Sequence, residues 1–419
     1  MSLPQRLLGV ADRLADGLGL LDRPLSPEQL IETACRRTGL SDFGEPSFDG
    51  ALRRLLDACS AEASLSVVGQ SALRWDGVRF LSNLLRMRAA ERGEPALLDQ
   101  PIVAPIFITG LPRSGTTFLH RLMMEDTANR GPRVFETIAP YPPARGADRR
   151  VKRVGRQLRG FERIAPEFRS LHPLDASSPQ ECCEINAHVF RSLRFDTTYQ
   201  IPSYREWLDN EGHLEGYLFH RRFLQHLQHQ QGARRWVLKC PDHLFALREL
   251  RTVYPDARVV FVHRDPVKVL LSVTRLTEVL RQPFTRRLDR ARIGRDEAAR
   301  WYDGTLRMIQ AEQEQPFAEP ICHVHHLDLI SDPVATVEAV YAHFGLMLPE
   351  TAARRIAQAV AEQPNGGYGR HDYRFEDHGL DEEAEHDRFR AYMVAFGIER
   401  ESRPRGGRRA AVSAGASAG

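Results

Sequence analysis

A short loop near residue 110 contains the residue types that bind phosphate groups. The segment IFITGLPRSGTTFLH joins an apolar run, Ile106–Ile108, to an amphipathic stretch through Gly110 and Gly115, and Thr116 and Thr117 follow the second glycine. The glycines permit a tight loop with converging backbone N–H groups, and the next helix presents its free N–H groups and positive dipole end to an anion. The order strand, loop, helix therefore predicts a phosphate-type site.

The loop departs from the common nucleoside-triphosphate pattern at one position. In G-x-x-x-x-G-K-[ST] the lysine reaches the β- and γ-phosphates and the hydroxyl holds Mg²⁺, whereas here Thr116 stands in the lysine position. A ligand with one capped 5'-phosphate needs only the amide groups and a nearby cation, which Arg113 can supply. A kinase with a degenerate loop and a glycine turn with an incidental arginine are the alternatives.

A second candidate anion site follows a later strand candidate. In ARVVFVHRDPVKVLLS, the run Arg258–Val262 is followed by Arg264, by Asp265 as a helix N-cap and by Pro266 at the first helical position. Ser272 comes eight residues after Arg264, so its distance from an anion held by Arg264 depends on how the helix lies against the sheet. The residues alone also allow Arg264 to be a surface ion-pair partner.

Together the two segments resemble the sulfotransferases that use 3'-phosphoadenosine-5'-phosphosulfate (PAPS). In that family a P-R/K-S-G-T-T loop binds the 5'-phosphosulfate, and an R-x-P-x-x-x-x-x-S element binds the 3'-phosphate. The resemblance extends to a bacterial branch through TGLSDFG, PRVFETIAPYPP, SPQE, WVLKCPDHL and HDYRFEDHGL, although His378 stands where an aromatic residue is more common. It implies that PAPS is bound by Arg113, Ser114, Gly115, Thr116, Thr117, Arg264 and Ser272.

The resemblance implies transfer of a sulfonate group from PAPS to a hydroxyl or similar acceptor, with PAP as the product. Such a transfer needs an in-line approach, a cation where charge develops on the leaving oxygen, and a base for the hydroxyl proton. The donor has no row of adjacent phosphates to clamp, so we expect the reaction to need no metal ion. A nucleotide-dependent kinase and a PAP-binding protein without turnover are the competing functions.

We assign the cation at the leaving oxygen to Lys239 together with Arg113. Lys239 follows the strand candidate Trp236–Leu238 and therefore lies at a carboxyl end of the sheet, where ligands gather in such folds. It resembles the lysine that related sulfotransferases place against the donor. The chain has lysine only here and at Lys152 and Lys268, which makes a lysine within a motif more notable.

Two residues are candidates for the base. Glu136 follows Val134 and Phe135, which we predict as a short strand, and resembles the catalytic glutamate of the tyrosylprotein and heparan sulfotransferases. His243 resembles the histidine of the cytosolic branch, although its spacing from Lys239 differs. We favour Glu136. A C-terminal loop closes over the nucleotide in the family, and Arg370, with His371 and Tyr373, is the corresponding candidate here.

A metal site is not expected from the histidines and cysteines. His323 and His325 alternate on one strand and His326 follows, but only Cys322 is a nearby partner. The cysteines lack metal-ligand spacing, and we expect free buried thiols. They are Cys35, Cys59, Cys182, Cys183, Cys240 and Cys322.

The elements that must hold these residues predict an α/β protein. Helical periodicity from about residue 7 to 92 predicts a helical N-terminal region, residues 1–100. Strand candidates that alternate with helical stretches then predict a parallel sheet with helices on both faces, residues 101–400, which is the P-loop NTPase-like fold that the resemblance implies. The tail, residues 401–419, has little to bury and is expected to be disordered. The strand candidates are Ile106–Ile108, Trp236–Leu238, Arg258–Val262 and Ile321–Leu327.

Composition narrows the possible partners. The chain has 419 residues, of which 42% are hydrophobic and 27% charged, as in ordinary globular proteins. The formal charge of +3, with the basic residues spread along the chain, indicates no nucleic-acid partner. Neither a signal peptide nor an apolar run of about 20 residues is visible, so we expect a cytoplasmic protein without a membrane segment.

The acceptor and the oligomeric state stay open at this level. A sterol, a lipid, a glycoside or a phenol would each suit the predicted chemistry. Aromatic residues between about 140 and 210 could line a pocket for a small-molecule acceptor, but such residues are more often core. They are Phe190, Phe195, Tyr199, Tyr204 and Trp207.

Overall fold

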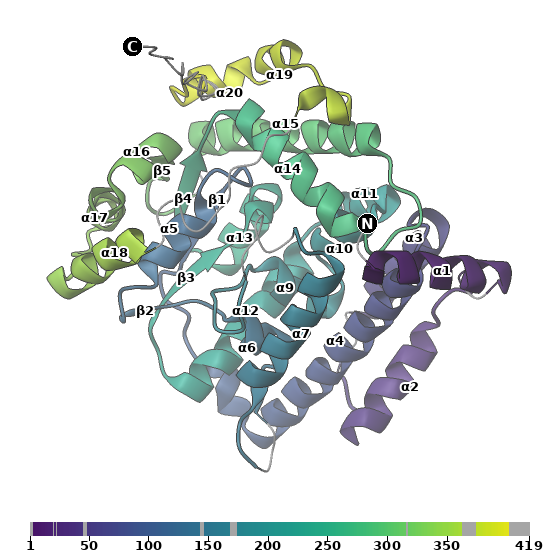
Figure 1. Ribbon diagram of the computed structural model, residues 1–419. Helices are drawn as coiled ribbons and strands as arrows, with labels where there is room; N and C mark the ends of the chain where they lie inside the picture. The colour runs from purple at the N-terminus through teal and green to yellow at the C-terminus, as the bar shows by residue number, and fades with distance from the viewer. Residues whose placement is uncertain are drawn as a thin grey trace, which may run out of the picture.

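A parallel sheet of five strands lies at the centre of the computed structural model, in the order β2-β3-β1-β4-β5, with helices on both faces (Figure 1). The structure describes residues 3–19, 21, 23–44, 48–142, 146–167, 174–315, 317–362 and 374–401. The strands are β1 Ile106–Gly110, β2 Asn129–Arg130, β3 Arg235–Lys239, β4 Arg258–His263 and β5 Cys322–His325. The predicted fold class is confirmed.

The two faces of the sheet bury alternate residues of the same strands. On β1, Ile106 and Ile108 pack in one apolar cluster with α5, α17 and α18, whereas Phe107 belongs to the larger cluster on the other face. On β4, Val260 and Phe261 divide in the same way. Since successive side chains of a strand point to opposite faces, the near-continuous apolar runs seen in the sequence are the mark of a sheet covered on both sides.

The helices of the described chain fill both layers and the N-terminal region. The N-terminal ones are α1 Leu3–Gly17, α2 Pro27–Thr38, α3 Asp49–Glu62 and α4 Val67–Gly93. Those from the sheet region are α5 Thr116–Met123, α6 Val134–Ile138, α7 Arg150–Ile164, α9 Cys183–Asn186, α10 Arg194–Tyr199, α11 Pro202–Glu211, α12 Leu214–Gln231, α13 Leu247–Val253, α14 Pro266–Arg281, α15 Arg290–Glu314, α16 His326–Ser331, α17 Pro333–His343, α18 Glu350–Glu362, α19 Glu382–Arg388 and α20 Arg390–Ala395. Short 3-10 helices are η1 Pro95–Asp99, η2 Ala187–Val189, η3 Pro241–Ala246 and η5 Phe375–His378.

The predicted helical N-terminal region is present and shares its core with the sheet. Leu52 and Leu55 of α3 and Leu81 and Leu85 of α4 are fully buried. They lie in the same apolar cluster as Phe107 of β1. The long helix α4 is therefore a wall of the main core, and one side of it can also face a site at the sheet edge.

The four predicted strands are observed, with two local corrections. The strand predicted to run to Leu327 ends at His325, because the chain turns into α16 at His326. The short strand predicted at Val134 and Phe135 is wrong: both residues lie in helix α6. The backbone N–H of Arg133 donates to Glu136 Oε2 at 2.8 Å, and such a capping contact at the third helical position favours a helix start over a strand.

Several other predictions can be located in the structure. All six cysteines are free thiols, although Cys35 and Cys183 are only half-buried. Among the aromatic candidates, Phe190, Phe195 and Tyr204 are core residues. Of the helices that the structure describes, none combines the length and apolar character needed to cross a bilayer. Arg370, His371, Tyr373 and the tail from 402 to 419 lie outside the described residues.

Candidate active site

The phosphate-type loop begins at Gly110, the last residue of β1, which pairs with Val262 of β4. Gly110 has φ 141°, and a Cβ atom at this position would lie 2.4 Å from the carbonyl oxygen of Val262. Only glycine therefore permits the loop to leave the sheet here. Gly115, with φ 106°, is the N-cap residue of α5, and Arg113 adopts φ 63° between them. The loop thus leads directly into the helix N-terminus, as the sequence predicted.

The two predicted anion elements are in direct contact. Arg264 Nη1 donates to the Arg113 carbonyl oxygen at 2.8 Å, and Arg113 Nε donates to Ser272 Oγ at 3.0 Å. Asp265 caps α14 and Pro266 is its first residue, as predicted. Helix α14 therefore lies so that Ser272, two turns into the helix, reaches the loop that follows β1.

The guanidinium group of Arg264 also binds a carboxylate from the C-terminal segment. Its Nε and Nη2 lie 2.8 and 2.9 Å from the two carboxylate oxygens of Glu401, and the Glu401 backbone N–H donates to Asp265 Oδ2 at 2.8 Å. Burial raises the pKa of Glu401, but the bonds to Arg264 outweigh burial and hold this pKa below its ordinary value. No sequence motif indicated that Glu401 reaches this arginine.

Lys239 ends β3 and reaches the same loop from the other side. Its side chain is almost fully buried. The ammonium group donates to Thr117 Oγ1 at 2.9 Å and forms an ion pair with Glu181. The predicted cation is thus next to the predicted loop, and Glu181 supplies the opposite charge that makes its burial tolerable.

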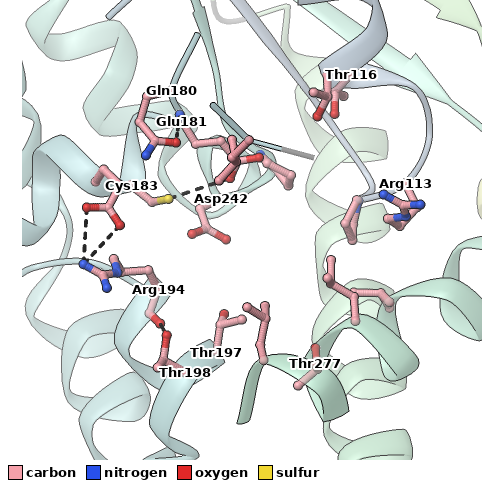
Figure 2. Close-up of a pocket in the computed structure, with 18 of the residues that line it drawn as sticks. Arg113, Thr116, Gln180, Glu181, Cys183, Arg194, Thr197, Thr198, Asp242 and Thr277 are labelled. Carbon is pink, nitrogen blue, oxygen red and sulfur yellow. Dashed lines mark hydrogen bonds and ion pairs between the residues drawn. The ribbon is translucent and has the colours of Figure 1, made fainter. Parts of the chain in front are cut away.

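A cavity of about 1180 Å³ opens beside the loop and Arg264. Lys239 is not among its lining residues, although its two partners, Thr117 and Glu181, are. Figure 2 shows Arg113 and Thr116 on one side of it and Glu181, Cys183 and Asp242 facing them. The predicted donor-binding residues that line it are Arg113, Gly115, Thr116, Thr117, Arg264 and Ser272. Ser114 does not line the cavity, because its hydroxyl is fully buried and donates to the Leu111 carbonyl oxygen at 2.7 Å. Ser114 therefore shapes the loop by closing its turn.

The two predicted bases are not brought to the cavity. Glu136 is buried, with one carboxylate oxygen bonded to the Arg133 N–H and the other to the Gln231 amide. His243 is also buried, its Nδ1 contacts the Tyr217 hydroxyl, and burial holds the pKa of this imidazole well below its ordinary value. Neither lines the cavity, so the geometry gives no support to a proton-transfer role for them.

Five acidic residues that the sequence analysis did not select line the cavity: Asp76, Glu181, Glu184, Asp242 and Glu297. Two of them, Asp242 and Glu181, are linked to Lys239 by sequence or by contact. Asp242 lies on η3, directly after the strand that carries Lys239, and accepts a hydrogen bond from Arg300 Nη2 at 2.7 Å. Desolvation raises the pKa of Asp242 above its ordinary value in spite of this arginine. Glu181 is the partner of Lys239. Both belong to segments already noted, SPQE and WVLKCPDHL, whose acidic residues were the available signal.

The site holds one group of potential metal ligands within the described part of the chain. Ligand atoms of Glu181, Cys183 and Cys240 lie within 4.8 Å of one another, but the ammonium group of Lys239 is already paired with Glu181. The histidines once considered are engaged elsewhere: His323 contacts Glu312, and His326 lies 3.0 Å from the Ser114 carbonyl oxygen. His326 thus supports the loop.

A parallel sheet that carries a phosphate loop without the Walker lysine, joined to a second arginine–serine element, defines a P-loop-like group-transfer enzyme. Residues 105–350 match the model of the sulfotransferase family, and the chain belongs to this family. The family that the sequence resemblance implied and the predicted sulfotransferase activity are both confirmed.

Relatives and solved structures agree with this assignment. The omega-hydroxy-beta-dihydromenaquinone-9 sulfotransferase Stf3 of Mycobacterium tuberculosis is 27% identical over 275 residues, 62% of this chain and 67% of that protein. The sulfotransferase STF1 of Mycobacterium tuberculosis H37Rv has a TM-score of 0.77 at 31% identity, over 88% of this chain and 99% of its own. STF9 of Mycobacterium avium has a TM-score of 0.81 at 26% identity, over 90% and 98%.

Proposed function

We propose that this sulfotransferase uses PAPS as donor and transfers the sulfonate group to a hydroxyl of an apolar small molecule. The observation that carries the donor assignment is the pair of hydrogen bonds that join Arg264 and Ser272 to Arg113. They place both anion elements at one end of one cavity, so a single nucleotide with phosphates at its 5' and 3' positions suits them. A triphosphate has no lysine in this loop to meet its γ-phosphate.

Each end of the donor has its own set of partners in this proposal. The loop amides, with the hydroxyls of Thr116 and Thr117 and the N-terminus of α5, bind the 5'-phosphosulfate. Arg264 and Ser272 bind the 3'-phosphate, and Arg264 then exchanges the Glu401 carboxylate for a phosphate oxygen pair. Arg370 stays a further candidate contact from the C-terminal loop.

Lys239 and Arg113 act at the leaving oxygen. As the bond from sulfur to the bridging oxygen breaks, negative charge grows on that oxygen, and a preorganised cation in a water-poor site stabilises it. Lys239 is held for this purpose by Thr117 and Glu181. These protein cations cover the developing charge, and we therefore propose transfer without a metal ion.

We propose Asp242 as the base, in place of Glu136 and His243. It lies across the cavity from Arg113 and Thr116 (Figure 2), on the side from which an acceptor approaches in line. Its raised pKa brings its proton affinity closer to that of a hydroxyl in the transition state, which improves proton transfer. The acceptor proton passes to Asp242 while the acceptor oxygen bonds to sulfur.

The acceptor is apolar in this proposal because the cavity wall opposite the donor end is apolar. Apolar side chains of α4, α7 and α14 and Phe284 line it, next to the charged Asp76 and Arg79 of α4. The relative Stf3, which is named for omega-hydroxy-beta-dihydromenaquinone-9, supports a lipophilic hydroxylated acceptor. We also propose a cytoplasmic location, since free thiols such as the six found here persist in reducing compartments.

Thermal shift with PAP and with ATP tests the donor. A ligand that binds only the folded state stabilises it, and the gain grows with the logarithm of the ligand concentration relative to its Kd. PAP is therefore expected to raise the Tm, and ATP is not. Stabilisation by ATP alone would favour the kinase alternative and contradict the proposal.

Turnover separates an enzyme from a PAP-binding protein. With labelled PAPS and a panel of hydroxylated lipids, in the presence of EDTA, we expect a sulfonated product detected by mass. Lys239→Ala should keep the PAP-induced shift and lose about 10²- to 10³-fold in kcat, while Arg251→Ala, at an exposed residue of α13, should keep both. Full activity of Lys239→Ala, or activity abolished by EDTA, would contradict the mechanism.

A further inference from the structure

Helix α7 turns an apolar face toward the cavity and leaves its other face uncovered. Only Arg150 and Val154 of its residues are buried. Leu158, Phe161 and Ile164, which follow Val154 at helical spacing, line the cavity, and the ring of Phe161 stacks on Phe284 with a centroid distance of 5.9 Å. The helix is therefore a cover of the acceptor end of the site.

The outer face of α7 and the residue before it are strongly basic. Their exposed side chains include Arg149, Lys152, Arg153, Arg156, Arg159 and Arg163. These positions recur at three- and four-residue steps, so they share one side of the helix. Within the part of the chain that the structure describes, no ion pair involves these six side chains. The expectation that basic residues are merely spread along the chain misses this cluster.

The basic surface continues onto two neighbouring helices. Desolvation lowers the pKa of Arg86 on α4, and the positive charges of Arg37 on α2 and Arg153 on α7 lower it further. Arginines from three helices therefore lie within electrostatic range of one another. We call the six residues on and before α7, together with Arg86 and Arg37, the basic face.

An exposed apolar ridge lies on helix α1, which contacts the helix that carries most of the basic face. Val10, Leu14 and Leu18 are 45, 65 and 71% exposed, and their four-residue spacing places them on one side of α1 and its C-terminal end. Helix α1 contacts both α4 and α7 (Figure 1). Trp75 on α4 is itself 40% exposed and lines the cavity. Basic residues, exposed apolar residues and the apolar end of the cavity thus occur together.

We propose that the basic face and the apolar ridge dock the enzyme on a membrane surface rich in anionic lipids, where the cavity can take a lipid-soluble acceptor from the bilayer. A basic amphipathic helix with adjacent apolar side chains has the composition of interfacial binding elements, and each basic residue near such a surface contributes about 1 kcal/mol. The acceptor part rests on the proposed function; the docking part does not. A nucleic acid would be attracted by the basic residues but would leave the apolar ridge without a role.

Vesicle flotation of the full chain tests the docking. The probe is a vesicle of phosphatidylcholine mixed with phosphatidylglycerol, compared with phosphatidylcholine alone. The variant is Arg156→Glu/Arg159→Glu/Arg163→Glu, and the control with the same change in net charge reverses three exposed arginines of α13 and α18, Arg248→Glu/Arg251→Glu/Arg354→Glu. A loss of 1 kcal/mol lowers a binding constant about fivefold. Loss of three contacts is therefore expected to weaken binding to the anionic vesicles about 100-fold or more.

The expected result is strong binding of the wild-type chain and of the control variant to anionic vesicles, with at most weak binding to phosphatidylcholine alone, and much weaker binding of the α7 variant to the anionic vesicles. No binding by the wild-type chain, equal loss in both variants, or binding to RNA in the absence of vesicle binding would overturn the proposal. The PAP-induced thermal shift is measured on every variant. An unchanged shift shows that the α7 variant is folded and that the donor proposal stands or fails separately from the docking.

Discussion

Neighbouring groups decide which carboxylates of this enzyme are available for proton transfer. Glu136 has both oxygens engaged by a backbone N–H and an amide, so it serves the start of α6. Asp242 lines the cavity. Desolvation has the largest effect on its pKa and raises it. The charges of Glu181 and Glu297 also raise this pKa, whereas Arg300 and His213 lower it. A desolvated acid that stays beside a cation is suited to accept a proton and then to lose it.

Asp242→Asn is expected to abolish the decrease of kcat at low pH, which is the acid limb of the pH–rate profile. A base works only when deprotonated, so kcat falls as the pH decreases through the pKa of Asp242. Because that pKa is raised above the ordinary 3.8, the limb should lie at higher pH than for an unperturbed aspartate. Removal of the carboxylate should lower kcat about 10²- to 10⁴-fold, measured with labelled PAPS at saturating acceptor.

Glu136→Gln is the matched control for this experiment. Glutamine can replace glutamate in a capping contact, so this variant should fold, bind PAP and keep the acid limb. If Glu136→Gln loses turnover and the limb while Asp242→Asn keeps both, the base is Glu136 as the sequence indicated, and our reading of the cavity is wrong.

At the scale of elements, the helices and strands that depend on a local sequence pattern could be predicted. The strands were recognised as apolar runs that end at glycine or before a helix signal, and the α14 start was recognised from Asp265 and Pro266. The pair Val134 and Phe135 was misread because two apolar residues fit either a strand or a helix. The two-residue strand β2 was missed because so short a segment has no periodicity.

The parts of the site that no local pattern controls could not be predicted. Arg113, Lys239, Arg264 and Ser272 can be selected as candidates from the sequence because they belong to motifs, and three of them, Arg113, Arg264 and Ser272, are in contact in the structure. The contact of Glu401 with Arg264 joins residues 137 positions apart and depends on how the C-terminal helices α19 and α20 pack on α14 and α15. Sequence spacing carries no information on such packing.

The C-terminal segment holds a carboxylate where we propose that the donor's 3'-phosphate binds. Bonds between a guanidinium fork and a carboxylate or phosphate are of the same kind, so Glu401 and the phosphate compete for Arg264. Glu401→Gln should bind PAP about tenfold more tightly, because hydrogen bonds to charged groups contribute about 1.5–3 kcal/mol. AMP, which lacks the 3'-phosphate, should bind both proteins equally in titration calorimetry.

The neighbouring exposed residue Glu399 provides the control. Glu399→Gln removes the same charge from the same segment and should leave both affinities unchanged. Weaker PAP binding by Glu401→Gln would show instead that Glu401 holds Arg264 in position for the phosphate.

At the scale of the whole molecule, the net charge of +3 hides a strong asymmetry. The basic face gathers positive charge on α7 and its neighbours, while most other arginines of the described chain are paired with acidic residues. The apolar ridge on α1 adds a second kind of attraction. Screening separates the two, because the Debye length is about 10 Å at 0.1 M salt and about 3 Å at 1 M, whereas salt does not screen apolar burial.

Leu14→Ser/Leu18→Ser should therefore change membrane binding mainly at high salt. The wild-type chain is expected to lose most vesicle binding as salt rises but to keep a residual part, which comes from apolar side chains inserted in the interface. The leucine variant should keep the binding at low salt and lose the residual part, and the α7 arginine variant should show the reverse. Leu306→Ser/Leu327→Ser, with leucines 42 and 47% exposed elsewhere, is the control. Equal salt curves for the wild-type chain and the Leu14/Leu18 variant would show that the ridge does not enter the membrane and that charge alone holds the enzyme there.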